Sequence, residues 1–178
     1  APPDEPKPGP IPPAIYYSPL ICISIYMDKR KYTRRKPYKG KFQPTDPSKY
    51  KGNPRNIIYR SMWERQCMVY FDRNENILEW SSEEVVIPYV SPFDGKVHRY
   101  YPDFFVKIKK GQMIEIRIIE IKPSKFLKPP KEGKRKTKAY LYEVREWGRN
   151  NAKWNAAQDY CEKRGWLFDI WTEKTLRM

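Results

Sequence analysis

Two runs of alternating apolar and polar residues, joined by a tight turn, lie between His98 and Pro123. Every second side chain in each run is apolar, as expected for strands with one buried face. These side chains are Phe104, Val106 and Ile108 in the first run and Ile114, Ile116 and Ile118 in the second. Gly111 and Gln112 are typical of the turn between such strands. The pattern predicts an antiparallel β-hairpin.

The predicted hairpin brings polar side chains together at the end away from its turn. Pairing about Gly111-Gln112 places Asp103 opposite Glu120. Side chains two residues apart on a strand share a face, so Glu120 and Lys122 point the same way. Carboxylates are hard oxygen ligands, of which Mg²⁺ typically takes one or two from a protein. The lysine can orient a water molecule or neutralise a phosphate. The alternative is that these three side chains form a solvated strand end.

A helix is predicted over residues 62–72. Ser61 and Glu64 have the spacing of a capping box, with Ser61 as N-cap. Trp63, Cys67, Tyr70 and Phe71 supply a buried stripe. Glu64 therefore has two interpretations: a capping carboxylate, or a carboxylate that the first helix carries to the polar end of the hairpin.

The remaining elements complete an α/β pattern. Strands are predicted over residues 77–81 and 85–90, and Pro88 favours an edge or a bulge in the second. A helix is predicted over residues 139–164, with a break near Gly148 left open, and Gly165 caps it. Residues 166–172 alternate as a last strand. The predicted order is helix, three strands, helix, strand.

Charge points to nucleic acid as the first candidate partner. The 178 residues carry a net charge of +15, with a pI of about 9.7, which favours a partner with repeated negative charge. Residues 27–60 hold twelve Lys and Arg residues and two acids, interleaved with aromatic residues, and residues 124–138 hold seven against one acid. Such segments neutralise phosphates, and their aromatic rings stack on bases. The alternatives are a solvated tail, or an acidic lipid or protein partner.

Histidine and cysteine usage narrows the chemistry. His98 is the only histidine, which excludes zinc sites of the Cys₂His₂ kind and nucleases that need paired histidines. Cys22, Cys67 and Cys161 lie far apart in the sequence and are expected to be reduced thiols. Carboxylates and lysines remain for phosphodiester chemistry.

The chain divides into three predicted parts: a Pro-rich and apolar extension (1–26), a basic arm (27–58) and a domain (59–178). Seven prolines fall within the first thirteen residues, which predicts an extended segment. The apolar stretch over residues 14–26 is too short to span a bilayer and lacks the basic region of a secretory signal. We therefore expect no membrane association.

The spacing of Pro102-Asp103 and Glu120-Ile121-Lys122, with sixteen residues between the two acids, resembles the PD-(D/E)xK nuclease superfamily. Within it the chain resembles TnsA-like endonucleases, and in particular head completion nucleases of large contractile-tailed phages. The stretches that carry the resemblance are Arg60-Ser61-x-Trp63-Glu64, residues 84–94 (EVVIPYVSPFD), residues 98–104 (HRYYPDF) and Glu120-Ile121-Lys122. It covers about residues 40–175 and leaves out residues 1–26.

The resemblance implies a restriction-endonuclease-like αβββαβ core and Mg²⁺- or Mn²⁺-dependent hydrolysis of DNA. It implies that Asp103 and Glu120 hold the metal with the Ile121 carbonyl, and that Lys122 is the catalytic lysine. Glu64 would bind a second metal ion or its water. By the same resemblance the second helix lends a polar residue, for which Lys153 and Gln158 are the candidates.

The implied setting is phage head completion after DNA packaging, in the host cytoplasm and then at the head–neck region of the virion. Expected partners are double-stranded DNA, portal or neck proteins and further copies of the chain. Two other functions stay open: a structural head–tail connector with a nuclease-like fold, and a transposon-type end-cleaving nuclease. The candidate DNA contacts are Lys29, Arg30, Arg34, Arg35, Lys36, Lys39, Lys125, Lys134, Arg135 and Lys136.

Overall fold

The computed structural model describes residues 38–131 and 136–176. In chain order the elements are β1 (Gly40–Phe42), η1 (Pro47–Lys49), β2 (Ile57–Tyr59), α1 (Met62–Arg73), β3 (Ile77–Ser82), β4 (Ile87–Val90), β5 (Val97–Tyr100), β6 (Phe104–Lys110), β7 (Met113–Ile121), η2 (Ser124–Leu127), α2 (Lys138–Glu162) and β8 (Leu167–Trp171). None of the helices in these two ranges is long and apolar enough to cross a membrane.

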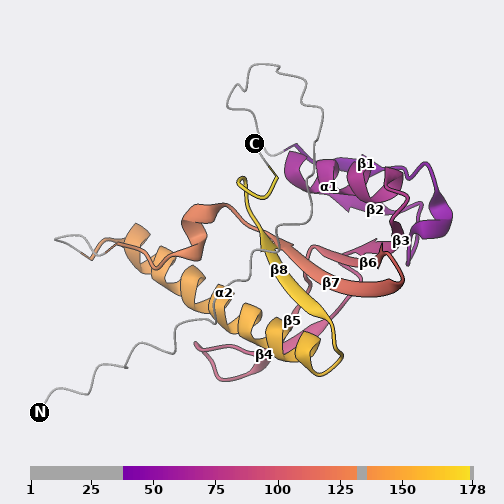
Figure 1. The fold of residues 1–178 in the computed structure, drawn as a ribbon. Helices are drawn as coiled ribbons and strands as arrows, with labels where there is room; N and C mark the ends of the chain where they lie inside the picture. Colours follow the sequence, from indigo (N-terminus) through magenta and orange to yellow (C-terminus); the bar gives the residue numbers. More distant parts are fainter. Residues whose placement is uncertain (1–37, 132–135, 177–178) are drawn as a thin grey trace, which may run out of the picture.

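A four-stranded mixed sheet in the order β3-β6-β7-β8 forms the centre of the molecule, with α1 and α2 on opposite faces (Figure 1). The first three strands are antiparallel, and β8 runs parallel to β7. Successive residues of β6 and β7 point alternately to the two faces of the sheet. Phe104 and Ile119 pack on the α1 side, whereas Phe105 and Ile118 pack with Cys161 of α2. This is the predicted restriction-endonuclease-like core.

The hairpin of β6 and β7 has the predicted register. Phe104 pairs with Ile119 and Lys110 with Met113, so the turn falls at Gly111-Gln112. Gly111 has a φ of 60°, a left-handed conformation that glycine adopts without steric cost. Continuing the same ladder by one residue beyond Phe104 sets Asp103 opposite Glu120, as the sequence predicts.

The strand predicted over residues 85–90 is shorter and leaves the central sheet. It forms β4, which pairs with β5 in a separate two-stranded sheet. Glu83, just before it, has a φ of 55°, so the chain turns sharply after β3. Pro102 separates β5 from β6, because proline has no N–H to donate to a ladder. The small sheet packs on α2 through Ile87, Tyr89 and Tyr100.

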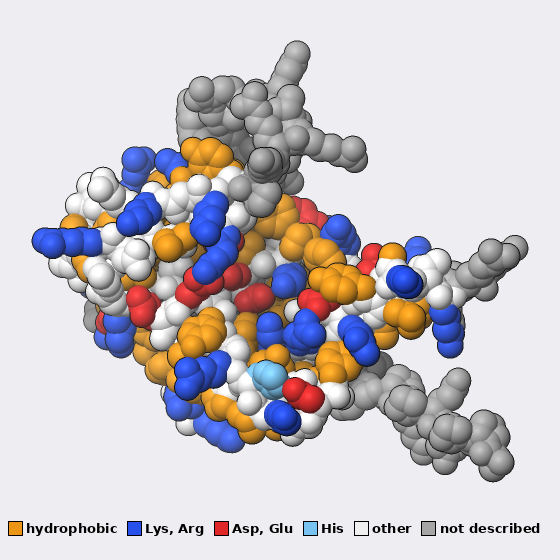
Figure 2. All heavy atoms as spheres, turned by 180° about the vertical axis from the view of Figure 1, so that it is seen from behind, with side chains coloured by type: hydrophobic (Ala, Val, Ile, Leu, Met, Phe, Trp, Pro, Cys, Tyr) orange, Lys and Arg blue, Asp and Glu red, His pale blue; other side chains and the backbone are white. Residues whose placement is uncertain are grey.

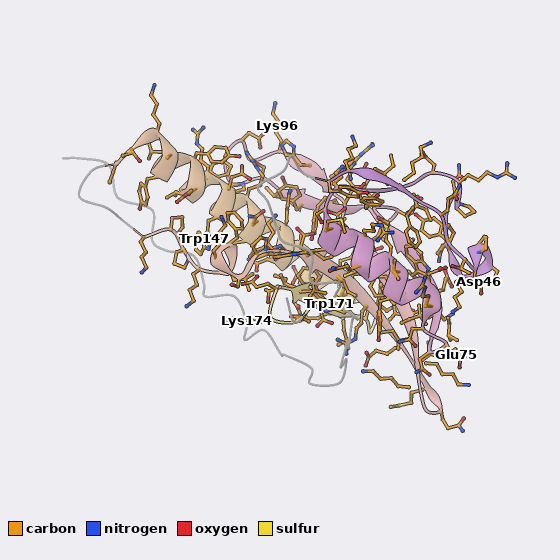
Figure 3. All side chains as sticks on the ribbon, turned by 90° about the horizontal axis from the view of Figure 1, so that it is seen from above. Asp46, Glu75, Lys96, Trp147, Trp171 and Lys174 are labelled. Atoms are coloured by element: carbon orange, nitrogen blue, oxygen red, sulfur yellow. The ribbon has the colours of Figure 1, made fainter. Side chains whose placement is uncertain are left out.

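Both predicted helices are present. α2 is continuous through Gly148, which lies against the Phe93 ring and does not break the helix. Trp154, Ala157 and Cys161 are buried on one face of α2, as predicted. In Figure 3, Trp171 at the end of β8 lies in the middle of the molecule, far from Asp46 and Glu75.

The second half of the predicted basic arm belongs to the folded body. Phe42, Tyr50 and Ile57 are buried in the core against Trp80 of β3. The Tyr50 ring meets the Trp80 ring edge-on, with 4.8 Å between centroids. Phe42 and Tyr50 are therefore not available to stack on bases. Residues 1–26, and the arm as far as residue 37, lie outside the described residues.

Candidate active site

Asp103 lies at the open end of the hairpin, immediately before β6. Its Oδ2 accepts a hydrogen bond of 2.6 Å from the backbone N–H of Ile121. Ile121 lies two residues beyond Ile119, the last residue of β7 that pairs with β6. The carboxylate thus continues the ladder where the strand pairing stops, and Asp103 is fixed at the end of β7.

Glu120 is buried, 8% exposed, on the α2 side of β7. Its Oε2 accepts a hydrogen bond of 2.8 Å from the Tyr100 hydroxyl. Its Oε1 lies 3.6 Å from Nζ of Lys122, which confirms that these two side chains point the same way. The Lys122 backbone is held by its N–H, which donates to the Trp171 carbonyl at 2.9 Å.

Lys153 of α2 is a second ammonium group near this carboxylate. Its Nζ lies 5.5 Å from the centroid of the Tyr100 ring and 5.9 Å from that of the Tyr89 ring. Burial lowers the pKa of Lys153, and the negative charge of Glu120 opposes that decrease. Gln158, the other candidate on α2, instead donates to Glu162 on the same helix at 2.9 Å. Of the two, the structure brings Lys153 to the site.

The two carboxylates repel each other in a partly dry environment. Burial raises the pKa of Asp103 well above its usual value, and the charge of Glu120 raises it further, against the opposing effect of the Ile121 N–H. Burial also raises the pKa of Glu120, which Lys122 and the Tyr100 hydroxyl lower again. One buried and one half-buried acid, both with raised pKa values and next to an ammonium group, are typical of a functional site.

Glu64 takes part in the predicted N-terminal cap of α1. The Ser61 hydroxyl accepts from the Glu64 backbone N–H at 3.2 Å and donates to Glu64 Oε1 at 2.8 Å. Glu64 Oε2 accepts from the backbone N–H of Arg60 at 2.7 Å. The charge of Glu64 also raises the pKa of Asp103. The first turn of α1 therefore places a carboxylate within electrostatic range of the hairpin end, from the opposite face of the sheet.

The donor set suits a hard divalent cation that keeps much of its hydration shell. Asp103 and Glu120 each use one carboxylate oxygen in a hydrogen bond to the protein. Glu120 is buried and Asp103 half-buried, so a cation bound by both would offset the repulsion between their charges, in addition to Lys122 and Lys153. Across residues 38–131 and 136–176, no group of three or more His, Cys, Asp or Glu side chains is placed to hold a metal ion. Two carboxylates are the number that Mg²⁺ commonly takes from a protein.

The predicted DNA-binding residues divide between described and undescribed segments. Lys39, Lys125 and Lys136 are exposed, and Nζ of Lys125 lies 4.7 Å from the Phe126 ring centroid in η2, the turn that follows Lys122. In Figure 2, acidic side chains gather in the middle of one face, with Lys and Arg side chains around them. The remaining candidates fall outside the described residues, namely Lys29, Arg30, Arg34, Arg35, Lys36, Lys134 and Arg135.

The site contains one residue that the sequence pattern did not single out. Tyr100 is part of the 98–104 stretch that carries the resemblance, but nothing in its spacing indicates a bond to Glu120. That contact joins β5, which belongs to the separate β4-β5 sheet, to β7 of the central sheet. His98, in contrast, points to Asp94, with 2.8 Å between Nε2 and Oδ2, and takes no part in the site.

The fold and site define a PD-(D/E)xK-type nuclease. A family model described as TnsA-like endonuclease N terminal matches residues 74–173, a span that includes Asp103, Glu120, Lys122 and Lys153. The chain belongs to this family of nucleases. A relative, the head completion nuclease of Enterobacteria phage T4, is 42% identical over 144 residues, which cover 79% of this chain and 94% of the relative.

Proposed function

We propose that this protein is a Mg²⁺- or Mn²⁺-dependent deoxyribonuclease that acts in phage head completion after DNA packaging. The observation that carries the chemistry is the convergence of Asp103, Glu120 and Lys122 at one end of the hairpin. The setting is supported by the name of the relative and by the alignment, which covers 94% of the relative's length.

Asp103 and Glu120 would hold the cation, with the carbonyl of Ile121 as a further ligand. A divalent cation in that place supplies positive charge against the scissile phosphate. Lys122 extends from β7 beside Glu120 and, in this proposal, orients the attacking water toward phosphorus and stabilises the developing negative charge. Exposed lysines, including Lys125 and Lys136, hold the duplex through its phosphates and leave its sequence unread.

The proposed place of action is the host cytoplasm during assembly and then the head–neck region of the virion, where portal or neck proteins and further copies of the chain are the proposed neighbours. A structural connector remains the contrasting function. A connector has no need of paired, largely enclosed carboxylates beside a lysine, and for this reason we prefer the enzyme.

A plasmid assay tests the proposal. Purified protein is incubated with supercoiled plasmid in Mg²⁺, in Mn²⁺ and in EDTA, alongside the Asp103→Asn variant. We expect nicked or linear DNA with either metal, and intact plasmid with EDTA or with the variant. If the wild type cuts no form of DNA with either metal, and a phage carrying Asp103→Asn assembles infectious particles, the connector function replaces the enzyme.

A further inference from the structure

Tyr100 approaches the candidate active site from outside the central sheet. It is the last residue of β5, which pairs with β4 and with no strand of the central sheet. Three residues later, Asp103 approaches the same end of β7. One short segment of chain thus contacts β7 twice: Tyr100 through the Glu120 side chain and Asp103 through the Ile121 N–H.

The Tyr100–Glu120 hydrogen bond is shielded from water. Tyr100 is 3% exposed and Glu120 8%. A phenol is protonated at neutral pH, so the Tyr100 hydroxyl is the donor and the Glu120 carboxylate the acceptor. The bond occupies Oε2 of Glu120 and leaves Oε1 on the Lys122 side, 3.6 Å from that ammonium.

We propose that Tyr100 is a positioning residue of the metal site, which fixes the Glu120 carboxylate so that Oε1 is presented to the cation. The inference deepens the proposed function and rests on it. A carboxylate whose second oxygen is held by a buried donor does not rotate away when the cation leaves. Partners of this kind orient the groups that ligate a metal and raise affinity for it.

The ring of Tyr100 has a separate task from its hydroxyl. The Lys153 ammonium lies over this ring and over that of Tyr89. The aromatic faces hold a cation that is half-buried beside Glu120. Because ring and hydroxyl contact different partners, Tyr100→Phe removes the bond to Glu120 and keeps the platform under Lys153.

If the role of Tyr100 is only to pack in the core, a different result is expected. Tyr100 packs in the cluster of Ile87, Tyr89 and Ala157 between the small sheet and α2. If packing is its only role, Tyr100→Phe, which keeps the ring, leaves metal affinity unaltered. Affinity for the cation therefore separates the two roles, and thermal stability alone does not.

The test measures Mn²⁺ binding to the full chain by electron paramagnetic resonance, and the Mn²⁺ concentration that gives half-maximal plasmid nicking. The variants are Tyr100→Phe and, as a matched control, Tyr101→Phe, which removes the hydroxyl of the exposed neighbour. Positioning residues around metals typically contribute about 10–100-fold in affinity. We expect a loss in that range for Tyr100→Phe, and wild-type values for Tyr101→Phe.

A Glu120→Gln background provides a second measurement. If Tyr100 acts through Glu120, adding Tyr100→Phe to Glu120→Gln lowers Mn²⁺ affinity no further, because interacting positions are not additive. Wild-type Mn²⁺ affinity in Tyr100→Phe, or an undiminished further loss in the double variant, overturns the inference while the proposed function stands. A wild-type protein that neither binds Mn²⁺ nor cuts DNA overturns both.

Discussion

Asp103 accepts a hydrogen bond of 2.6 Å from the backbone N–H of Ile121, the residue between Glu120 and Lys122. The contact ties the first acid of the Asp103…Glu120-x-Lys122 pattern to the backbone that carries the other two side chains. An amide that a partner strand would otherwise satisfy is used here to orient a carboxylate.

Asp103→Asn is expected to abolish metal-dependent DNA cleavage and to leave DNA binding intact or tighter. Asparagine keeps the shape and still accepts from Ile121, but the cation loses an anionic ligand. Removing the charge also reduces repulsion of the phosphate. Plasmid nicking and a gel-shift titration measure the two effects. Asp94→Asn, which removes a carboxylate paired with His98 instead, is the control and should cut normally. If the Asp103→Asn variant still cleaves DNA, Asp103 is not part of the active site.

The same variant is expected to alter how stability depends on pH in the absence of metal. Burial and Glu120 raise the pKa of Asp103, so between the unfolded and folded pKa values the folded state binds more protons than the unfolded state. The free energy of unfolding of the wild type therefore falls as pH rises between these two pKa values. Asp103→Asn should therefore have a Tm a few degrees above that of the wild type at pH 7.

The difference should shrink as pH falls toward the ordinary pKa of aspartate, because both proteins are then uncharged at this position. Thermal unfolding in EDTA, recorded from pH 4 to pH 8, gives the comparison. A stability difference that stays the same at every pH would show that Asp103 carries no unfavourable charge in the folded protein.

Lys122→Ala is expected to lower the cleavage rate about 100–1,000-fold, the usual cost of removing one group that stabilises a transition state. Mn²⁺ affinity should fall much less, because in the proposed function the ammonium acts on the phosphate and is not a metal ligand. Single-turnover cleavage at saturating Mn²⁺ separates the two effects. Lys125→Ala, three residues further on, is the control. If Lys122→Ala and Lys125→Ala lower the cleavage rate equally, Lys122 is one phosphate contact among several and has no special catalytic role.

Glu64→Gln is expected to lower cleavage at least about tenfold with an unaltered Tm. Glutamine can still accept from the Arg60 N–H, so the cap of α1 persists, whereas the anionic oxygen that would bind a second metal ion or its water is lost. Glu64→Ala, in contrast, should also cost about 0.5–2 kcal/mol of stability, as lost caps do. Full activity in Glu64→Gln would leave this residue with capping as its only role.

DNA affinity is expected to fall with salt, with a log–log slope of about −0.9 for each phosphate contacted. Residues 27–36 precede the described residues and contain six Lys and Arg residues. Their deletion should flatten that slope and leave Tm unchanged. Lys109→Gln, at the turn end of the hairpin, serves as the control. An unchanged slope after the deletion would assign these residues to a solvated tail or a protein-docking segment.

The sequence by itself determined the hairpin and its polar end. Period-two alternation at Phe104, Val106 and Ile108 and a glycine turn fix the register, because a slip of one residue would turn every apolar side chain to the wrong face. The register in turn sets Asp103 opposite Glu120. The capping pair Ser61 and Glu64 likewise fixed the start of α1 through local hydrogen bonds alone.

Only the tertiary structure decided which other groups reach that end. The Tyr100 hydroxyl meets Glu120 because β4 and β5 leave the central sheet, and Lys153 arrives because α2 packs across the small sheet. The burial of Phe42 and Tyr50, in the segment predicted to be a basic arm, depends on Trp80, which lies 38 and 30 residues further along the chain. Contacts of this kind join segments that are distant in the sequence. The hydrophobic pattern of one segment does not indicate which other segment it will contact.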